Sequence, residues 1–266
     1  MPITLSIEQT PSLVAPGQTV FLPGAAGAPS PFVDALLQTP ERSAGLDIFM
    51  TYVPGINAIN LDRLSPSARV SGLFMQPAFG SAQREGRYRH LPMSYAGFVR
   101  HLRDELTPDL VAVQVAPPDA KGRCSLGPTA EFVPTAVAKA KRVLGLINPQ
   151  VPAMAGAASI AYSDFAAVCE VDSALPTYTT DSDAATEAIA ANLASLIPDG
   201  ATLQVGLGKV PAALSRLLRN HRKLRLHSGM LSDGFIELSE AGALDENFPH
   251  NTCVLVGSEE LYRRLA

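Results

Sequence analysis

The stretch from Pro198 to Asp233 constrains the fold most, because it joins a strand, a glycine turn and a helix within a short length of chain. Thr202 to Val205 is a brief apolar run between a Pro-Asp-Gly turn and glycines, which predicts a short buried strand. The flexible turn Gly206-Leu207-Gly208 follows, and Pro211 suits the first turn of a helix that Ala212 to Leu218 continues. Such a junction leaves backbone N–H groups free to bind an anionic or carbonyl ligand.

The same pattern occurs a second time near the N-terminus. A turn at Pro16-Gly17 leads to a Thr-led strand over Thr19 to Leu22, a glycine turn at Gly24 to Gly27, a proline and an apolar helix over Phe32 to Leu37. Another short strand follows each of the two helices, over Leu46 to Met50 and over Leu224 to His227. A single repeat at this wide spacing predicts two related α/β units, because solenoid repeats recur every 20–50 residues or so.

Between the two copies, strand and helix patterns alternate with short connections, which favours an α/β fold with mainly parallel sheets. Leu110 to Val115 is typical of a strand buried on both faces of such a sheet. Pro54 to Gly86 is predicted to be irregular, and the polar stretch from Leu175 to Asp183 is the best linker. We therefore expect an N-terminal α/β domain over residues 1–180 and an incomplete second unit over residues 181–266.

The second unit is predicted to contain three parallel strands, at Thr202–Val205, Leu224–His227 and Cys253–Gly257. Its helices are expected over Asp183–Leu196, capped by Asp183, and over Gly234–Ala241. Three apolar strands with so few helices do not readily cover both faces of a parallel sheet. We therefore expect association with another copy of this chain or with a complementing subunit.

Composition excludes several classes of protein. Hydrophobic residues make up 47% of the 266-residue chain and charged residues 17%, which indicates a globular protein. A net charge of −4 predicts no binding to nucleic acid or to an anionic membrane. We expect neither a signal peptide nor a membrane span. Three widely spaced cysteines predict free thiols in a reducing cytoplasm, and no metal-ligand spacing occurs, so no metal is expected.

Isolated reactive side chains give weaker signals. Cys124 follows a predicted strand, but without an arranged His or acid it is interpreted as a buried small residue rather than a nucleophile. His227 is either an acid/base group or a structural histidine. Asp233 with Gly234 is most simply a helix cap and turn. A basic cluster is interpreted as a solvated loop rather than an anion site, and it consists of Arg84, Arg87, Arg89 and His90. Glu237 and Glu240 are expected at the surface.

Three motifs together resemble the acetyl-CoA hydrolase/4-hydroxybutyrate CoA-transferase family. They are Pro118-Asp119-x-x-Gly122-x-Cys124-Ser125-Leu126-Gly127, Asp199-Gly200-Ala201-Thr202-Leu203-Gln204-x-Gly206-x-Gly208 and His227-Ser228-x-Met230-x-Ser232-Asp233-Gly234. The resemblance runs in order from about residue 16 to the last helix, and it implies two similar CoA-transferase-like α/β domains. It also implies CoA transfer between small carboxylic acids, or acyl-CoA hydrolysis, through a glutamyl-CoA thioester.

By this resemblance, Gly206, Leu207, Gly208, Lys209 and Val210 contact the thioester end of CoA, where backbone N–H groups stabilise an oxyanion. The family's nucleophilic glutamate lies between the Ser and Met of His-Ser-Glu-Met, where this sequence has Gly229. The family also continues well past the last residues of this sequence. The resemblance therefore leaves three hypotheses. The chain is an enzyme that a partner chain completes or that needs no glutamate, a catalytically inactive CoA-binding or scaffold homologue, or a truncated or altered copy of an ordinary transferase.

Overall fold

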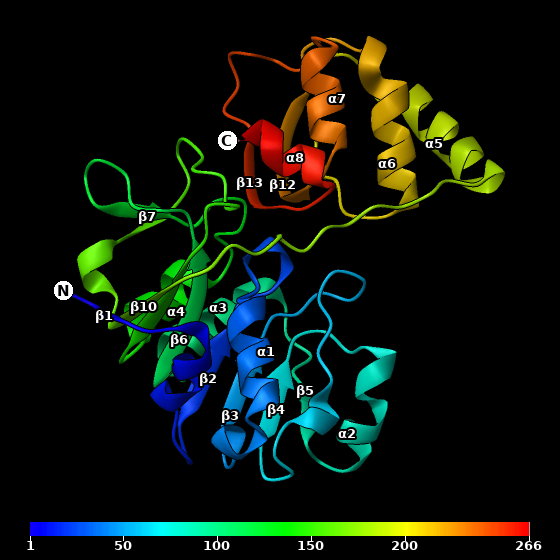
Figure 1. Cartoon of the computed structure of the whole chain (residues 1–266). Helices are drawn as coiled ribbons and strands as arrows, with labels where there is room; N and C mark the ends of the chain where they lie inside the picture. The colour runs from blue at the N-terminus through cyan, green and yellow to red at the C-terminus, as the bar shows by residue number, and fades with distance from the viewer. Residues whose placement is uncertain (266) are drawn as a thin grey trace. The chain divides into compact units, whose positions relative to one another are not determined.

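The computed structural model describes residues 1–265, which form two compact units, Met1–Pro176 and Thr177–Leu265 (Figure 1). The division falls inside the stretch predicted to be a linker. Each unit has its own sheet and its own helices, and each is described by itself below.

The first unit is built on an eight-stranded parallel sheet in the order β1-β10-β8-β6-β2-β3-β4-β5. Its strands are β1 (Ile3–Thr4), β2 (Thr19–Leu22), β3 (Asp47–Met50), β4 (Arg69–Gly72), β5 (Tyr88–His90), β6 (Leu110–Val115), β8 (Val143–Ile147) and β10 (Ala167–Glu170). A separate antiparallel pair joins β7 (Arg123–Ser125) to β9 (Ser159–Ala161). The predicted α/β architecture with a mainly parallel sheet is confirmed.

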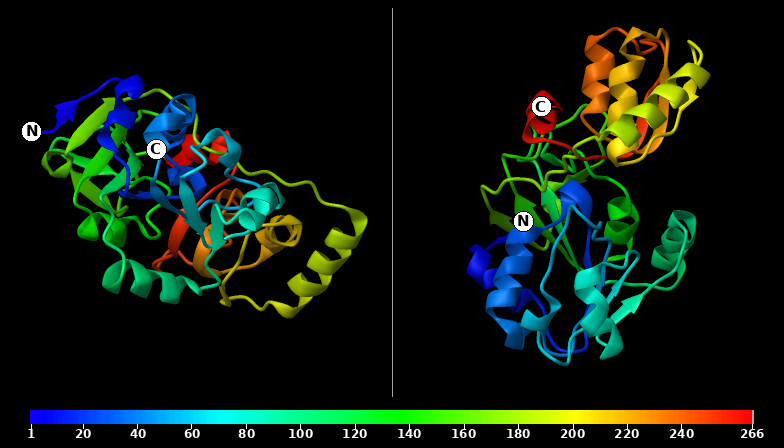
Figure 2. Two further views of the ribbon diagram at one scale, coloured as in Figure 1. Left: turned by 90° about the horizontal axis from the view of Figure 1, so that it is seen from below. Right: turned by 90° about the vertical axis from the view of Figure 1, so that its right-hand side faces the viewer.

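Helices cover both faces of this sheet, as Figures 1 and 2 show, so its strands are apolar on both sides. In β2, Val20 and Leu22 pack into one core with α1 (Ser30–Gln38), while Phe21 packs into the other. The second core also contains α3 (Tyr95–Asp104) and α4 (Val133–Lys139). All six residues of β6 are buried, which confirms the prediction for Leu110 to Val115.

The prediction of an irregular segment from Pro54 to Gly86 is wrong. This segment contains β4, which pairs in parallel with β3, and the short helix α2 (Gly80–Arg84). Strand β4 is four residues long and carries Arg69, Ser71 and Gly72, so its sequence lacks the apolar run by which a buried strand is recognised. Its pairing with β3 decides the conformation instead.

The second unit has the three predicted parallel strands, in the order β11-β12-β13. Strand β11 (Thr202–Leu203) is shorter than expected, β12 (Arg225–Leu231) is longer, and β13 (Asn251–Leu255) begins two residues earlier. The helices are α5 (Ala184–Leu196), α6 (Lys209–Leu217), α7 (Gly234–Glu240) and α8 (Glu259–Leu265). The Asp183 cap of α5 is confirmed, because its carboxylate accepts a hydrogen bond from the Thr186 nitrogen at 2.9 Å.

Helix α5 is unusual because it is apolar around most of its circumference and yet exposed. It carries one charged residue, Glu187, in thirteen, and only Thr186 and Ala190 are buried. Ile189, Leu193 and Leu196 share one side of the helix and are 50%, 38% and 77% exposed. Helices with this composition are normally buried.

Candidate functional site

The predicted ligand loop, residues 206–210, lies between β11 and α6 in the second unit. Gly208 is the N-cap of α6 and has a φ of 133°, which glycine adopts readily and residues with a Cβ rarely do. Lys209 and Val210 form the first turn of α6, and the Lys209 ammonium lies 3.3 Å from the Asp183 carboxylate, with both side chains exposed. The turn Gly206-Leu207-Gly208 therefore joins a strand to a helix, as the sequence predicts.

Ser228 ties this loop to strand β12. The Val205 N–H donates to the Ser228 hydroxyl oxygen at 3.1 Å, and that hydroxyl lies 2.5 Å from the Val205 carbonyl oxygen and 2.8 Å from that of Met230. The side chain thus replaces the ladder of backbone hydrogen bonds that ends at Leu203. Because Leu203 pairs with Leu226, the loop leaves the sheet beside the segment that contains Gly229.

Gly229, which the sequence resemblance assigns to the family's glutamate position, is exposed and lies within β12. A Cβ added there has no heavy atom within 4 Å, and its φ lies outside the left-handed region. The same space surrounds a Cβ added at Gly206. Both positions therefore leave the backbone open to close approach.

His227 and Asp233 flank this segment. His227 is exposed on β12 in register with Asn251, and its acid/base role stays a prediction. Asp233 occupies the N-cap position of α7, but its carboxylate makes no cap hydrogen bond there. It instead accepts bonds from the Ser258 nitrogen (3.0 Å) and hydroxyl (2.6 Å), which corrects the simple cap interpretation. Local sequence patterns do not indicate this link, because 25 residues separate its partners.

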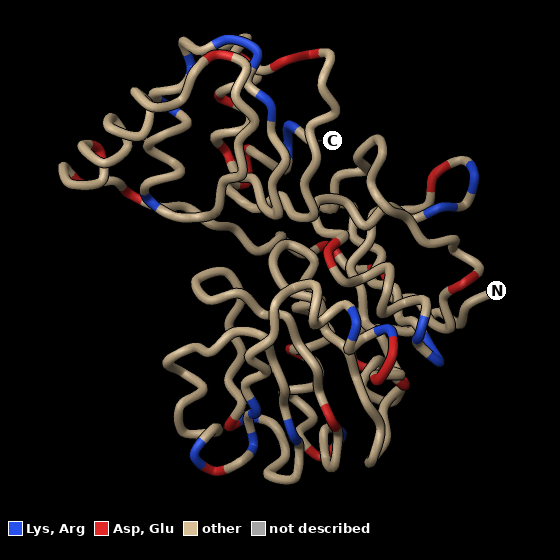
Figure 3. Tube along the Cα trace, turned by 180° about the vertical axis from the view of Figure 1, so that it is seen from behind, with Lys and Arg blue, Asp and Glu red and all other residues tan. Residues whose placement is uncertain are grey.

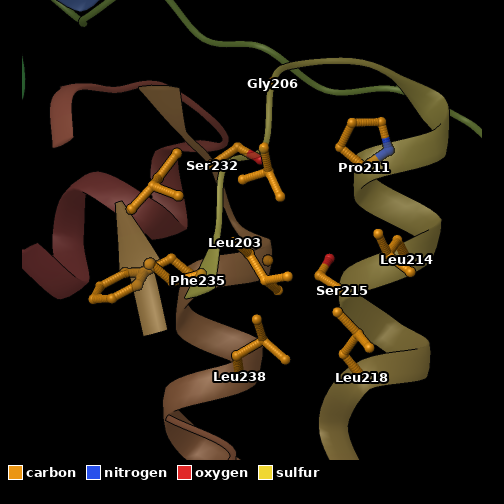
Figure 4. Close-up of a pocket in the computed structure, with 13 residues that line it drawn as sticks. Leu203, Gly206, Pro211, Leu214, Ser215, Leu218, Ser232, Phe235 and Leu238 are labelled. Atoms are coloured by element: carbon orange, nitrogen blue, oxygen red, sulfur yellow. The ribbon is translucent and has the colours of Figure 1, made fainter. Parts of the chain in front are cut away.

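A small apolar cavity of about 30 Å³ lies below the loop, between the sheet and helices α6 and α7 (Figure 4). Its walls include Leu203 of β11, Leu214 of α6 and Leu238 of α7. The cavity also adjoins Val205, Gly206 and Pro211, so it extends up to the glycine turn.

In the first unit, buried amide side chains hold the glycine turn at Gly24 to Gly27, which contains a single 3₁₀ turn (Ala25–Gly27) before α1. The Asn57 carbonyl accepts from the Ala25 nitrogen at 2.7 Å, and its amide donates to the Ala25 carbonyl at 3.0 Å. A Cβ on Gly24 would lie 2.0 Å from the Thr51 carbonyl oxygen, so no other residue fits there. The sequence repeat correctly located this turn but not the polar groups that fix it.

The remaining candidates have structural roles. Cys124 is fully buried, and burial raises the pKa of its thiol, as expected of a non-nucleophile. Arg84 lies in α2, and Arg89 and His90 lie in β5, so the interpretation of the basic cluster as a solvated loop is wrong. Arg87 pairs with Asp62 and Glu85, both at 2.6 Å. Glu240 is exposed, but Glu237 is half-buried and its Oε2 has no partner, so the expectation of a surface position is wrong for Glu237.

Charges of both signs are distributed over each unit (Figure 3). Within residues 1–265, no group of three or more His, Cys, Asp or Glu side chains is arranged to hold a metal ion. None of the helices described there is long and apolar enough to cross a membrane.

Comparisons with known proteins give a consistent result. A family model, the acetyl-CoA hydrolase/transferase N-terminal domain, matches residues 4–176, which is nearly the whole first unit. The 4-hydroxybutyrate coenzyme A transferase of Clostridium kluyveri is 30% identical over 269 residues, covering 97% of this chain and 62% of the relative. The succinyl-CoA:acetate/propanoyl-CoA:succinate CoA transferase of Fasciola hepatica is 30% identical over 244 residues, covering 89% and 50%.

Solved structures agree with the fold. The 4-hydroxybutyrate CoA-transferase of Porphyromonas gingivalis superposes with a TM-score of 0.78 at 25% identity, over 99% of this chain and 65% of that one. RipA from Yersinia pestis has the same fold, with a TM-score of 0.89 at 22% identity, and the superposition covers 99% of this chain and 66% of RipA. The chain thus spans between half and two thirds of the length of these relatives.

Proposed function

The chain belongs to the acetyl-CoA hydrolase/transferase family, and on that premise we propose that it binds acyl-CoA and small carboxylic acids for CoA transfer or acyl-CoA hydrolysis. In this proposal the catalytic site is completed by a partner chain. The three free cysteines support a reducing, cytoplasmic setting.

The observation that carries the proposal is the open glycine turn beside Gly229. Gly206, Leu207, Gly208, Lys209 and Val210 form the CoA-binding loop in this proposal. Two features support that assignment: the space around Gly206 and the left-handed Gly208, which together let a thioester approach the backbone N–H groups at the start of α6. When bound, CoA supplies the thioester, and this chain's residues bind and orient it.

The need for a partner follows from two features of the second unit. Gly229 has no side chain, so the carboxylate that attacks the thioester carbonyl must come from elsewhere. One face of the three-stranded sheet, which carries Arg225, His227 and Gly229, is exposed, although parallel sheets are normally covered on both faces. A complementing subunit satisfies both needs, whereas a second copy, which also has Gly229, covers the sheet and supplies a carboxylate only from another position.

The second candidate function is that of a catalytically inactive CoA-binding or scaffold homologue. Gly229 is the observation that favours it, because a family member without its nucleophile retains binding while losing turnover. The two functions share the CoA-binding loop and differ in chemistry.

Binding is tested by titrating the purified chain with acetyl-CoA in a calorimeter. Gly208→Ala should weaken binding at least tenfold, because an alanine is strained at a φ of 133°. Gly200→Ala is the matched control: Gly200 is also left-handed with open space around it, but it lies before β11. Equal loss in both variants, or no binding by the wild type, contradicts the proposed loop.

Catalysis is tested by measuring acetyl-CoA hydrolysis and CoA transfer to butyrate. Both reactions are measured first with the purified chain alone and then after cell extract is added. Proteins from the extract that bind the chain are then isolated and tested in the same assays. Turnover that appears only with an added chain supports the transferase or hydrolase. Binding without turnover under every condition supports the inactive homologue.

A further inference from the structure

Two side chains that each have one buried oxygen atom without a hydrogen-bond partner lie two residues apart, in the segment that leads into α4. The Thr129 side chain is 1% exposed with its Oγ1 unpaired, and the Oε2 atom of Glu131 is buried and unpaired. They account for two of the five such side-chain atoms in residues 1–265. Because native proteins leave few buried polar atoms unpaired, this pair requires an explanation.

The backbone around them is also strained. Glu131 has a φ of 34°, and Ala25 in the first glycine turn has a φ of 49°, values that residues with a Cβ seldom adopt. The two segments are in contact, because a Cβ on Gly27 would lie 3.0 Å from Cβ and Cγ2 of Thr129. Strain of this kind concentrates at ligand sites.

Tyr95, the first residue of α3, contacts Glu131. A hydrogen bond from the Tyr95 side chain partly offsets the effect of burial, which raises the pKa of Glu131 to about 7. The Tyr95 ring is 45% exposed and packs against Phe132 at 5.1 Å and Phe74 at 6.4 Å between ring centroids. A partly exposed aromatic ring thus lies beside the Glu131 carboxyl.

We infer that Thr129 and Glu131 form a binding seat for the carboxylate of a small, apolar monocarboxylic acid, with the Tyr95 ring as its cover. The inference rests on the proposed function, which supplies a carboxylic acid as substrate. The Thr129 hydroxyl and the protonated Glu131 carboxyl each donate one hydrogen bond, so together they meet the two oxygen atoms of a carboxylate.

The surroundings select the rest of the ligand. Phe74 and Phe132, which both pack against the Tyr95 ring, offer an apolar surface to a short alkyl chain. Within the described residues no cation pairs with Glu131, and Tyr95 is the one titratable group that contributes to its pKa shift. A second carboxylate on the ligand would be desolvated without a counter-charge. Butyrate should therefore bind and succinate should not.

The test is titration of the full chain, without CoA, with butyrate and with succinate by saturation-transfer NMR. Butyrate stays ionised between pH 6 and pH 8, whereas Glu131 loses its proton, so wild-type affinity should fall roughly tenfold over this range. Glu131→Gln keeps a donor at every pH, and its affinity should change less than about twofold. Glu41→Gln, in the exposed 3₁₀ turn Pro40–Ser43, is the control that should behave like the wild type.

A second pair of variants tests the hydroxyl. Thr129→Val should weaken butyrate binding severalfold, and Thr129→Ser, which keeps the hydroxyl, should restore it. The inference is overturned if the wild type does not bind butyrate at pH 6, if succinate binds equally well, if Glu131→Gln keeps the tenfold pH dependence, or if Thr129→Val binds like the wild type. Acetyl-CoA binding measured on the same sample separates this failure from failure of the proposed function.

Discussion

The Ser228 hydroxyl bonds to both backbone groups of Val205, accepting from its N–H at 3.1 Å and lying 2.5 Å from its carbonyl oxygen. This single side chain extends the pairing of β11 with β12 beyond the point where the backbone ladder ends. It thereby fixes where the chain leaves the sheet and enters the glycine turn.

Ser228→Ala should therefore lower the free energy of unfolding by about 1–3 kcal/mol, because it leaves two backbone groups of Val205 without a partner. It should also weaken acetyl-CoA binding, since the loop loses its anchor. Urea unfolding and calorimetry measure the two effects. Ser239→Ala, at an exposed position in α7, should change neither. If Ser228→Ala unfolds and binds acetyl-CoA like the wild type, the loop is held by other contacts.

The stability of the chain should depend on the protonation of Glu131. Burial raises the pKa of this carboxyl from 4.5 to about 7, so the folded state binds the proton more tightly than the unfolded chain does. The contribution of the protonated Glu131 to the free energy of unfolding is fully present below pH 4.5. This contribution, roughly 3 kcal/mol in all, is lost as the pH rises through 7. Glu131→Gln should match the wild type near pH 4 and be more stable at pH 8. Urea unfolding measures the free energy of unfolding of both proteins at pH 4 and pH 8. A difference between Glu131→Gln and the wild type that is the same at both pH values would contradict this prediction.

The three thiols should differ in reactivity. Cys253 on β13 is exposed, whereas Cys124 and Cys169 are buried, and burial raises the pKa of both buried thiols. One thiol per native chain should react rapidly with iodoacetamide, and all three should react in denaturant. Peptide mass mapping identifies the modified residue, and Cys253→Ser should lose the rapid phase. Rapid labelling of Cys124 would mean that the first unit opens more readily than its packing indicates.

The sequence predicted those features that local chemistry determines. The glycine turns follow from the repeated pattern of glycines and prolines around Gly24 and Gly206, and β6 follows from the valine-rich run over Leu110 to Val115. Strand β4 was missed because its pairing with β3 overrides a weak local preference. The roles of Ser228, Asp233 and Glu131 depend on partners distant in sequence or on burial, which periodicity does not reveal.

Position 229 provides a test of the missing nucleophile. The wild type should form no covalent glutamyl-CoA adduct and show no ping-pong transfer, because Gly229 has no carboxylate. Gly229→Glu should fold normally, since a Cβ there meets no atom within 4 Å, whereas Gly257→Ala should be destabilised by about 1–3 kcal/mol because its Cβ would lie 2.4 Å from the Asp233 carboxylate.

With a complementing chain present, Gly229→Glu should gain some adduct that borohydride traps, detected by intact mass. A CoA-sized increment on the wild type, for example on the half-buried Glu237, would contradict the inactive role of Gly229.

The apolar side of α5 should drive association with another chain. Ile189, Leu193 and Leu196 are exposed on a helix whose composition is that of a buried one, and burying them removes apolar surface from water. The wild type should therefore elute above the 28.0 kDa monomer in size-exclusion chromatography with light scattering.

Two charges, Ile189→Lys with Leu196→Lys, should shift the population to monomer without lowering helix content. Ala191→Lys is the control, because Ala191 is exposed about 200° around the helix from Ile189 and should not affect association. A wild type that is monodisperse at 28.0 kDa, unfolds cooperatively and binds no dye for apolar surface would contradict the prediction, and would mean that α5 tolerates its exposed leucines without a partner.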